Sequence, residues 1–293
     1  MSIPRNHHYL PEFYLKRWAK DGQVVRYTRP LGANGALDCR MKPPSAVCFE
    51  TDLYHLPDII DPDNSQIIEK NLFQRVDDKA ALALSKFDQP QALTLEEHEA
   101  LCQFVISLLH RTPDRLAALS VDISKQTNGA PFAGLIGKDY DDKLKATTNR
   151  LLLMLVQSNS TLSDFSKFKA IRIVIIGASK SLLTSDRPMT ASAQLNAGDA
   201  YILLPYAPDR LLILTQHESI AKAFEYEANK NSNKFVSSIN KAIVEQSENI
   251  IIADNKKPTR MIDKLFLRPH GHVVCPAGLI RRSVPMSKRP FSA

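Results

Sequence analysis

Four polar side chains of the types that carry out acid–base and phosphoryl chemistry lie in four separate segments of the chain: His8, Glu69, Arg111 and Asp186. An imidazole can act as a general acid or base near neutral pH, and carboxylates can orient it or bind a divalent metal ion. A guanidinium can stabilise negative charge that develops during the reaction. Cleavage of a phosphodiester bond could use all four groups, provided that the fold brings their segments together.

Glu69 is the strongest single signal, because it interrupts an apolar helical face. The capping residues around Asp61 and the periodicity that follows predict one long helix over residues 61–87. At about 100° per residue, five apolar side chains fall within about 40° of Glu69. They are Phe73, Val76, Ala80, Ala83 and Phe87. An unpaired carboxylate in that stripe would be costly, so Glu69 must be neutral, paired or bound to a ligand.

Arg111 closes the next predicted helix, which begins at Thr94. Thr94 and Glu97 have the spacing of a capping box, and an apolar stripe follows from Leu101. Arg111 falls at the edge of that stripe and is expected to point inward. Two interpretations stay open: the guanidinium pairs with Glu69, or its planar fork holds a phosphate or carboxylate.

His8 and Asp186 each have a functional and a structural interpretation. His7 and His8 precede Pro11, which suits the first position of a helix, so the two imidazoles are expected at the mouth of that helix. His8 could be a general base or a metal ligand, or it could cap the helix. Asp186 ends a strand predicted over residues 182–186, where it could be a catalytic acid or an ordinary turn residue before Pro188.

The strands and helices that would position these four residues indicate an α+β fold. Strand signals flank Asn34–Gly35, which is typical of a β-hairpin turn near the N-terminus. Helical periodicity dominates residues 61–166, and β-branched runs dominate residues 168–254, without regular alternation of strands and helices. We therefore expect a helix-rich core packed on a mostly antiparallel sheet. One domain over residues 1–267 would be followed by an irregular basic tail, residues 268–293.

Composition narrows the class of protein. The chain of 293 residues is 44% hydrophobic and 24% charged, with four cysteines and no CxxC pair, which favours a reduced cytoplasmic setting. No apolar run approaches the roughly 20 residues of a membrane helix. The net charge is +7, and the tail from Arg268 onward contains five basic residues and no acid. That tail could attract nucleic acid, although basic ends are also often simply solvated.

The chain also resembles a bacterial family known only as domain of unknown function 4238, over roughly residues 5–267. The resemblance is carried by His7-His8-Tyr9-x-Pro11-x-Phe13-x-Leu15, Glu69, Arg111-Thr112-Pro113, Thr184-Ser185-Asp186-x-Pro188 and the strand ending at Leu204-Pro205. It implies a shared fold and a shared position for the site. It implies no particular reaction.

Two hypotheses from different classes follow. The first is a nuclease-like hydrolase that cleaves phosphodiesters with His8, Glu69, Arg111 and Asp186, with or without a divalent metal ion. The alternative is a non-catalytic protein that binds nucleic acid or another anion, in which these residues form a buried structural network. The chain lacks a P-loop, a GxGxxG motif, a GxSxG elbow and an HExxH pair, which disfavours the enzyme classes built on those motifs.

Overall fold

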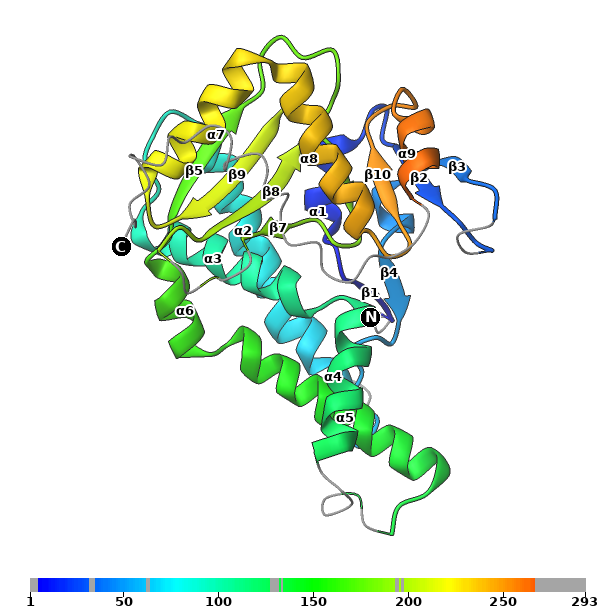
Figure 1. Ribbon diagram of the computed structural model, residues 1–293. Helices are drawn as coiled ribbons and strands as arrows, with labels where there is room; N and C mark the ends of the chain where they lie inside the picture. Colours follow the sequence, from blue (N-terminus) through cyan, green and yellow to red (C-terminus); the bar gives the residue numbers. More distant parts are fainter. Residues whose placement is uncertain are drawn as a thin grey trace. The chain divides into compact units, whose positions relative to one another are not determined.

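The computed structural model describes residues 5–31, 35–61, 64–126, 132, 134–192, 195 and 198–266 (Figure 1). The chain divides into two compact units, and each is made of separate stretches of sequence. The first unit comprises Met1–Pro11 and Cys48–Ser166, and the second comprises Glu12–Val47 and Lys167–Ala293. Helices and antiparallel strands are segregated along the chain, so the predicted α+β class is confirmed.

The first unit is a helical assembly with a small β-ribbon. Strand β1 (Asn6–His8) pairs antiparallel with β4 (Phe49–Thr51), and His8 lies opposite Phe49. Its helices are α2 (Gln74–Phe87), α3 (Leu95–His110), α4 (Pro113–Gln126), α5 (Gly137–Val156) and α6 (Asn159–Ser166). Helix α3 packs against α2, α5 and α6, so it lies at the centre of this unit.

The segment before α2 differs from the continuous α-helix predicted over residues 61–87. A 3₁₀ turn, η3 (Asn64–Gln66), is followed by a π-helix, η4 (Ile68–Phe73), and only then by α2. The backbone N–H of Gln74 donates to the carbonyl of Glu69, which is the i→i+5 bond of a π-helix. The apolar residues from Phe73 to Phe87 are buried as predicted, whereas Glu69 is only partly buried because the α-helical spacing does not extend to it.

Helix α3 begins as its sequence predicts. The side chain of Thr94 accepts a hydrogen bond from the backbone N–H of Glu97, and the Glu97 side chain accepts one from the Thr94 N–H. This capping box satisfies two of the donors that a helix start leaves unpaired. The stripe from Leu101 to Leu108 is buried, and the helix ends with Arg111 at its C-cap.

The second unit contains two four-stranded antiparallel sheets. One has the order β3–β2–β10–β6, and the other has the order β5–β9–β8–β7. Their strands are β2 (Val24–Thr28), β3 (Asp38–Lys42), β5 (Lys169–Val174), β6 (Thr184–Ser185), β7 (Thr190–Ala191), β8 (Tyr201–Ala207), β9 (Arg210–Thr215) and β10 (Ile251–Ala253). The predicted pairing of β2 with β3 is confirmed, and Asn34 in the predicted turn lies outside the described residues.

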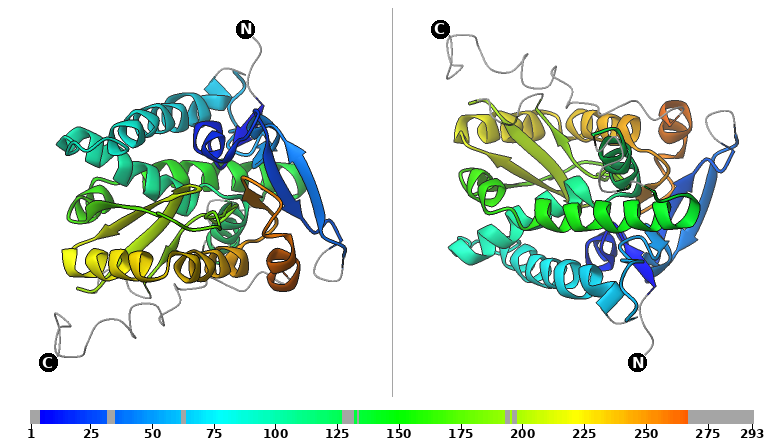
Figure 2. Two further views of the ribbon diagram at one scale, coloured as in Figure 1. Left: turned by 90° about the horizontal axis from the view of Figure 1, so that it is seen from above. Right: turned by 90° about the horizontal axis from the view of Figure 1, so that it is seen from below.

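Helical segments complete the second unit (Figure 2). Near the N-terminus lie α1 (Glu12–Leu15), η1 (Lys16–Trp18) and η2 (Pro44–Ala46). Toward the other end lie α7 (Glu218–Lys230), α8 (Ser232–Gln246) and α9 (Thr259–Leu265). Helix α7 packs on β5 and β9, and α8 packs on α7, α9 and β6, so both long helices cover sheet surface.

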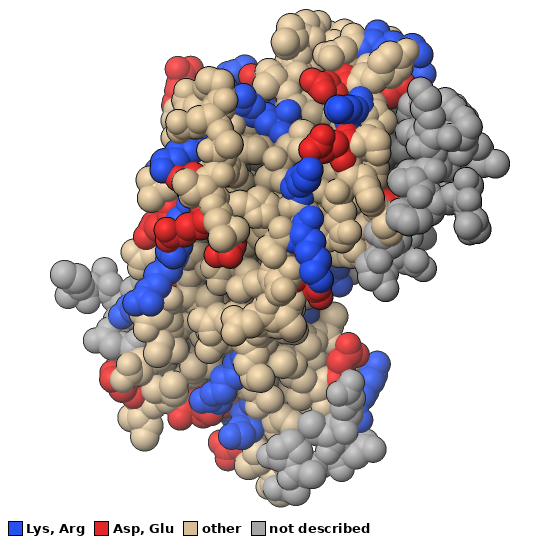
Figure 3. Space-filling view, turned by 90° about the vertical axis from the view of Figure 1, so that its left-hand side faces the viewer, with Lys and Arg blue, Asp and Glu red and all other residues tan. Residues whose placement is uncertain are grey.

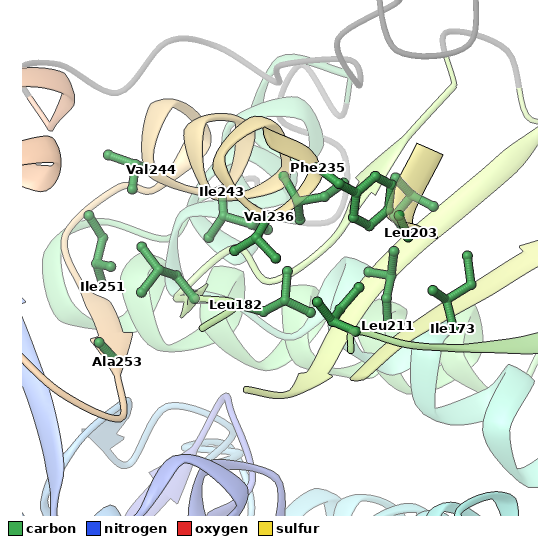
Figure 4. Packing of buried hydrophobic residues seen from close by; sticks show 14 of the residues in the cluster. Ile173, Leu182, Leu203, Leu211, Phe235, Val236, Ile243, Val244, Ile251 and Ala253 are labelled. Carbon is green, nitrogen blue, oxygen red and sulfur yellow. The ribbon is translucent and has the colours of Figure 1, made fainter. Parts of the chain in front are cut away.

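The core of the second unit joins side chains from both sheets with side chains from α7 and α8 (Figure 4). Leu203 and Leu211 come from one sheet, Ile251 comes from the other, and Phe235 and Val236 come from α8. All five are at most 2% exposed. Burial of large apolar side chains on this scale is the main term that stabilises such a unit.

Strand β8 is longer than its sequence suggests. The sequence suggests a strand that ends at Leu204-Pro205, but the strand continues to Ala207 and all seven of its residues are buried. Its pairing with β9 shifts register between Pro205 and Ala207, at a β-bulge. A bulge tolerates proline because one residue there is left out of the hydrogen-bond ladder. No helix among the described residues is long and apolar enough to cross a membrane.

Candidate functional site

Arg111 is the centre of a buried polar cluster in the first unit. Its side chain is fully buried and lies over the rings of Phe73 and Phe104, at 5.3 and 5.8 Å from their centroids. Nη1 donates to Asp77 Oδ1 at 2.9 Å, and Nε donates to the carbonyl of Tyr9 at 3.0 Å. Nη2 has no hydrogen-bond partner among the described residues. The guanidinium therefore keeps one buried donor for something else.

Asp77, on α2, is the acid that pairs with Arg111. The sequence had suggested Glu69 for that role, and the ion pair with Asp77 corrects this. Burial raises the pKa of Asp77 to about 6, although the charge and the hydrogen bond of Arg111 oppose the rise. Burial is the larger effect because the low-dielectric surroundings disfavour the charged form. At neutral pH the carboxylate is still predominantly ionised and balances the guanidinium.

Glu69 belongs to the same cluster, on the π-helix. Its Oε2 is shielded from solvent and has no hydrogen-bond partner within the described ranges. Burial raises the pKa of Glu69 to about 7; the nearby Arg111 lowers it and Asp77 raises it further. A carboxyl group with this pKa can take up or release a proton at neutral pH, as a general acid or base must. π-Helical turns are frequent at functional sites, because they redirect a side chain from the regular helical face.

Tyr54 joins the N-terminal motif to the end of α3. Its hydroxyl donates to the carbonyl of Arg111 at 2.7 Å, and its backbone N–H donates to His7 Nδ1 at 2.9 Å. The rings of Tyr54 and His7 are stacked, with centroids 5.5 Å apart and planes 5° from parallel. Since Nδ1 of His7 accepts a hydrogen bond from the Tyr54 N–H, the neutral imidazole carries its own proton on Nε2.

His7 and His8 lie on opposite faces of the β1–β4 ribbon, because successive side chains of a strand alternate. His7 is fully buried against Tyr54, whereas His8 is partly buried beside Phe49, with ring centroids 5.6 Å apart. The two imidazoles lie on a strand. We had expected them at the start of a helix, and the structure corrects that expectation. His7 therefore contacts the Arg111 cluster through Tyr54. The catalytic role of His8 stays a prediction.

Asp186 belongs to the second unit, at the end of β6. Its Oδ1 accepts from Ser247 Oγ at 3.1 Å and from the Glu248 N–H at 3.0 Å. Its Oδ2 accepts from the N–H groups of Asn249 and Ile250, at 2.5 and 3.0 Å. Burial raises the pKa of Asp186 to about 6, and these four donors oppose the rise. Asp186 thus holds the turn between α8 and β10.

The polar atoms that remain unsatisfied concentrate in the first unit. Among the described residues, four of the five buried side-chain atoms without a hydrogen-bond partner lie there: Gln66 Oε1, Glu69 Oε2, Arg111 Nη2 and Thr112 Oγ1. A buried polar atom is stabilised by a hydrogen-bond partner, so these four atoms are the groups of the cluster that could bind a ligand or water. No group of three or more His, Cys, Asp and Glu side chains in the described part could hold a metal ion.

The structure thus brings Glu69 and Arg111 into one cluster and adds three residues that sequence reasoning did not select: Asp77, Tyr54 and His7. Asp77 lies eight positions after Glu69 and bonds Arg111 directly, whereas Glu69, on the π-helix, acts on the cluster through its charge. Burial of His7 could have been inferred from strand alternation, if β1 had been recognised as a strand. Tyr54 gave no signal, because its hydroxyl bonds a backbone carbonyl and the His7 ring it stacks on lies 47 positions earlier.

Comparison with known proteins agrees with the motifs. A family model described as "Protein of unknown function (DUF4238)" matches residues 6–257, which span both units and every residue of the cluster. No curated protein and no solved structure matches the chain. Because the match covers most of the chain, this protein belongs to the DUF4238 family of proteins of unknown function.

Proposed function

We propose that the protein is a hydrolase that cleaves phosphodiester bonds in the first unit, with Glu69 transferring the proton and Arg111 binding a phosphoryl oxygen. One observation carries the proposal: a carboxylate oxygen and a guanidinium nitrogen of one cluster are both buried, and neither has a hydrogen-bond partner in the part of the chain that the structure describes. The two groups require complementary ligands. Arg111 Nη2 needs an acceptor oxygen, and ionised Glu69 needs a donor.

A phosphodiester with an attacking water would satisfy both groups. The phosphoryl oxygen would accept from Arg111 Nη2, and the water would donate to Glu69. As the water oxygen bonds to phosphorus and the bond to the leaving oxygen breaks, Glu69 would take the proton of the water. The guanidinium would stabilise the negative charge on the phosphoryl oxygens. The products are a phosphate monoester and an alcohol, whose oxygen takes up a proton that His8 is our candidate to supply.

Asp186 has a structural role within the second unit, and we assign it no catalytic role in this proposal. Both of its oxygens already accept two hydrogen bonds each, from Ser247 Oγ and from three backbone N–H groups. It therefore acts as a positioning residue for the turn at residues 247–250. The basic tail, residues 268–293, lies outside the described residues and could add salt-dependent attraction to nucleic acid. On the face shown in Figure 3, basic and acidic side chains are interspersed, which gives that face no extended field of one sign.

The test compares Glu69→Gln with Glu96→Gln, which changes an acid whose side chain is 81% exposed on α3. Single- and double-stranded DNA and RNA and a bis-aryl phosphodiester are incubated with the full chain in Mg²⁺, Mn²⁺ or EDTA. We expect the parent and Glu96→Gln to cleave at equal rates and Glu69→Gln to lose about a hundredfold or more. A parent that cleaves none of these substrates, or a Glu69→Gln variant that cleaves normally, contradicts the proposal.

A second candidate is a non-catalytic protein that binds an anion and uses the cluster to fix helix packing. The complete burial of Arg111 between two aromatic rings favours it, because such packing is typical of structural arginines. This function predicts that Glu69→Gln and Arg111→Met lower the melting temperature while no hydrolytic activity exists to be lost. The two candidates therefore separate in the cleavage assay.

A further inference from the structure

We propose that the Arg111 cluster binds a monoanionic phosphodiester together with one proton, which Glu69 holds between its carboxyl group and the ligand. The inference rests on the anion-accepting role of Arg111 in the proposed function, but it does not require that the bound ester be cleaved. The proton-bound complex is the unreactive form, and Glu69 can act as the base of the proposed function only after this proton has left. The inference names a substrate class for the site and predicts that binding becomes tighter as the pH falls.

The argument begins with the charges. Arg111 contributes one positive charge, and Asp77 already balances it through the 2.9 Å hydrogen bond from Nη1. An ionised Glu69 leaves the cluster with one excess negative charge before any ligand arrives. A monoanion at Nη2 would raise that excess to two, in surroundings where like charges repel strongly. One proton taken up by the cluster removes half of that excess and makes an anion acceptable.

The hydrogen bonds decide which acid takes the proton. Asp77 Oδ1 accepts from Arg111, and that bond is strongest when the carboxylate is ionised. Glu69 Oε2 accepts no hydrogen bond from any described residue, so a proton there breaks none of the described bonds. The protonated carboxyl then becomes a donor and can bond a second oxygen of the ligand. Glu69 also titrates near neutral pH, which makes this uptake accessible in solution.

Other titratable groups around the cluster either form hydrogen bonds of their own or act on it through charge. His7 Nδ1 accepts from the Tyr54 N–H, so protonating it would break that bond. The Tyr54 hydroxyl donates to the Arg111 carbonyl. Asp78 and Glu50 act only by adding negative charge near Asp77 and Tyr54.

The elements η3 and α5 pack on the π-helix, and two charged groups on or next to them, Asp52 and Arg150, are paired within the described part of the chain. Asp52, which accepts a weak hydrogen bond from Gln66 of η3, is paired with Arg5. On α5, Arg150 is paired with Asp58, and Asn149 donates to backbone carbonyls. The proton that accompanies the anion therefore goes to Glu69.

This charge balance selects the ligand. A phosphodiester carries one negative charge, whereas a phosphomonoester or sulfate carries a second that the single guanidinium, shared with Asp77, does not balance. The ligand also needs two oxygens, one for Arg111 Nη2 and one for the protonated Glu69. Dimethyl phosphate is a suitable probe, because it has both oxygens and its charge stays constant from acidic to alkaline pH. Any pH dependence of its binding then comes from the protein.

Isothermal titration calorimetry of the full chain with dimethyl phosphate tests the proposal. Repeating the titration in buffers of different ionisation enthalpy counts the protons that accompany binding. For the parent we expect uptake approaching one proton at pH 8 and an affinity that falls by up to about tenfold per pH unit above 7. Sulfate should bind more weakly than dimethyl phosphate at every pH.

Two variants and one control locate the proton. Glu69→Gln keeps the size of the side chain and supplies a permanent donor, so we expect it to bind with no proton uptake and no pH dependence. Arg111→Lys, checked for folding by circular dichroism, should bind at least tenfold more weakly, because the planar fork is lost. Glu96→Gln should behave like the parent. Absence of binding to the parent, or an unchanged proton count in Glu69→Gln, would overturn the inference.

The outcome is separable from that of the cleavage assay. Proton-coupled binding without cleavage of any phosphodiester would overturn the hydrolase function and leave this inference standing. Cleavage that depends on Glu69, accompanied by binding with no proton uptake, would do the reverse.

Discussion

Arg111 and Asp77 form an ion pair between the C-cap of α3 and the first turn of α2, with Nη1 and Oδ1 2.9 Å apart. The Arg111 side chain is fully buried and that of Asp77 is 19% exposed. Their pairing fixes the position of the end of α3 relative to the start of α2. It also determines that Glu69, and not Asp77, is the acid with a free buried oxygen. The stability and the chemistry of the first unit therefore depend on the same contact.

A double-mutant cycle measures this contact. Arg111→Met leaves a buried Asp77 without its partner, and we expect the free energy of unfolding to fall by about 3–5 kcal/mol. Asp77→Leu combined with Arg111→Met removes both charges and should recover a large part of that loss. Urea unfolding followed by circular dichroism gives each value. If the double variant is no more stable than Arg111→Met alone, the coupling between the two residues is absent.

The two histidines form a matched pair, because they are neighbours in sequence but lie on opposite faces of β1. His7→Ala removes a buried ring and leaves the Tyr54 N–H without an acceptor, so it should destabilise the protein by about 2 kcal/mol. His8→Ala changes a partly exposed ring and should cost less than about 1 kcal/mol. If His8 protonates the leaving group, its variant loses activity at nearly unchanged stability. Thermal melts and the cleavage assay together distinguish these effects.

Asp186→Asn tests the turn at residues 247–250. The amide keeps one acceptor oxygen but places an NH₂ group against two backbone donors, so we expect a loss of about 3 kcal/mol in the free energy of unfolding. Asp209→Asn serves as the control, because the Asp209 side chain is 57% exposed beside Arg210. It should change stability by less than about 0.5 kcal/mol. Equal effects of the two substitutions would show that the Asp186 hydrogen bonds do not hold the turn.

The pH dependence of stability reports on Glu69. Its pKa rises from 4.5 to about 7 on folding, so between these values the folded state binds more protons than the unfolded state. Stability therefore falls as the pH rises through that window, by at most about 1.4 kcal/mol per pH unit from this residue. Glu69→Gln removes the contribution. The difference in melting temperature between pH 5 and pH 7.5 should be smaller in the variant than in the parent, and an equal difference in both would contradict the assignment.

Local signals predicted much of this fold. The Thr94–Glu97 capping box and the apolar stripe of α3 were read correctly, because neighbours in sequence determine both. Pairing of β2 with β3 was predicted from the turn between them. The position of Arg111 at the edge of the α3 stripe correctly indicated an inward guanidinium.

Other features were beyond the reach of sequence patterns for physical reasons. The π-helix changes the angular spacing before α2, so the regular helical step misplaced Glu69 and hid Asp77 as the partner of Arg111. Donors to Asp186 come from residues more than sixty positions later, mostly as backbone N–H groups, which carry no side-chain signature. Strand β1 has only three residues, too few to show an alternation, so its two imidazoles were assigned to a helix start.

The pairing of β2 with β10 places Val25 opposite Ala253. During synthesis one edge of β2 therefore stays unpaired until β10, residues 251–253, has left the ribosome. Most of the first unit, by contrast, comes from one uninterrupted stretch, Cys48–Ser166, which can collapse sooner. Order of translation and order of folding thus diverge in this protein, and a nascent chain stopped before Ile251 would display an open strand edge to its neighbours.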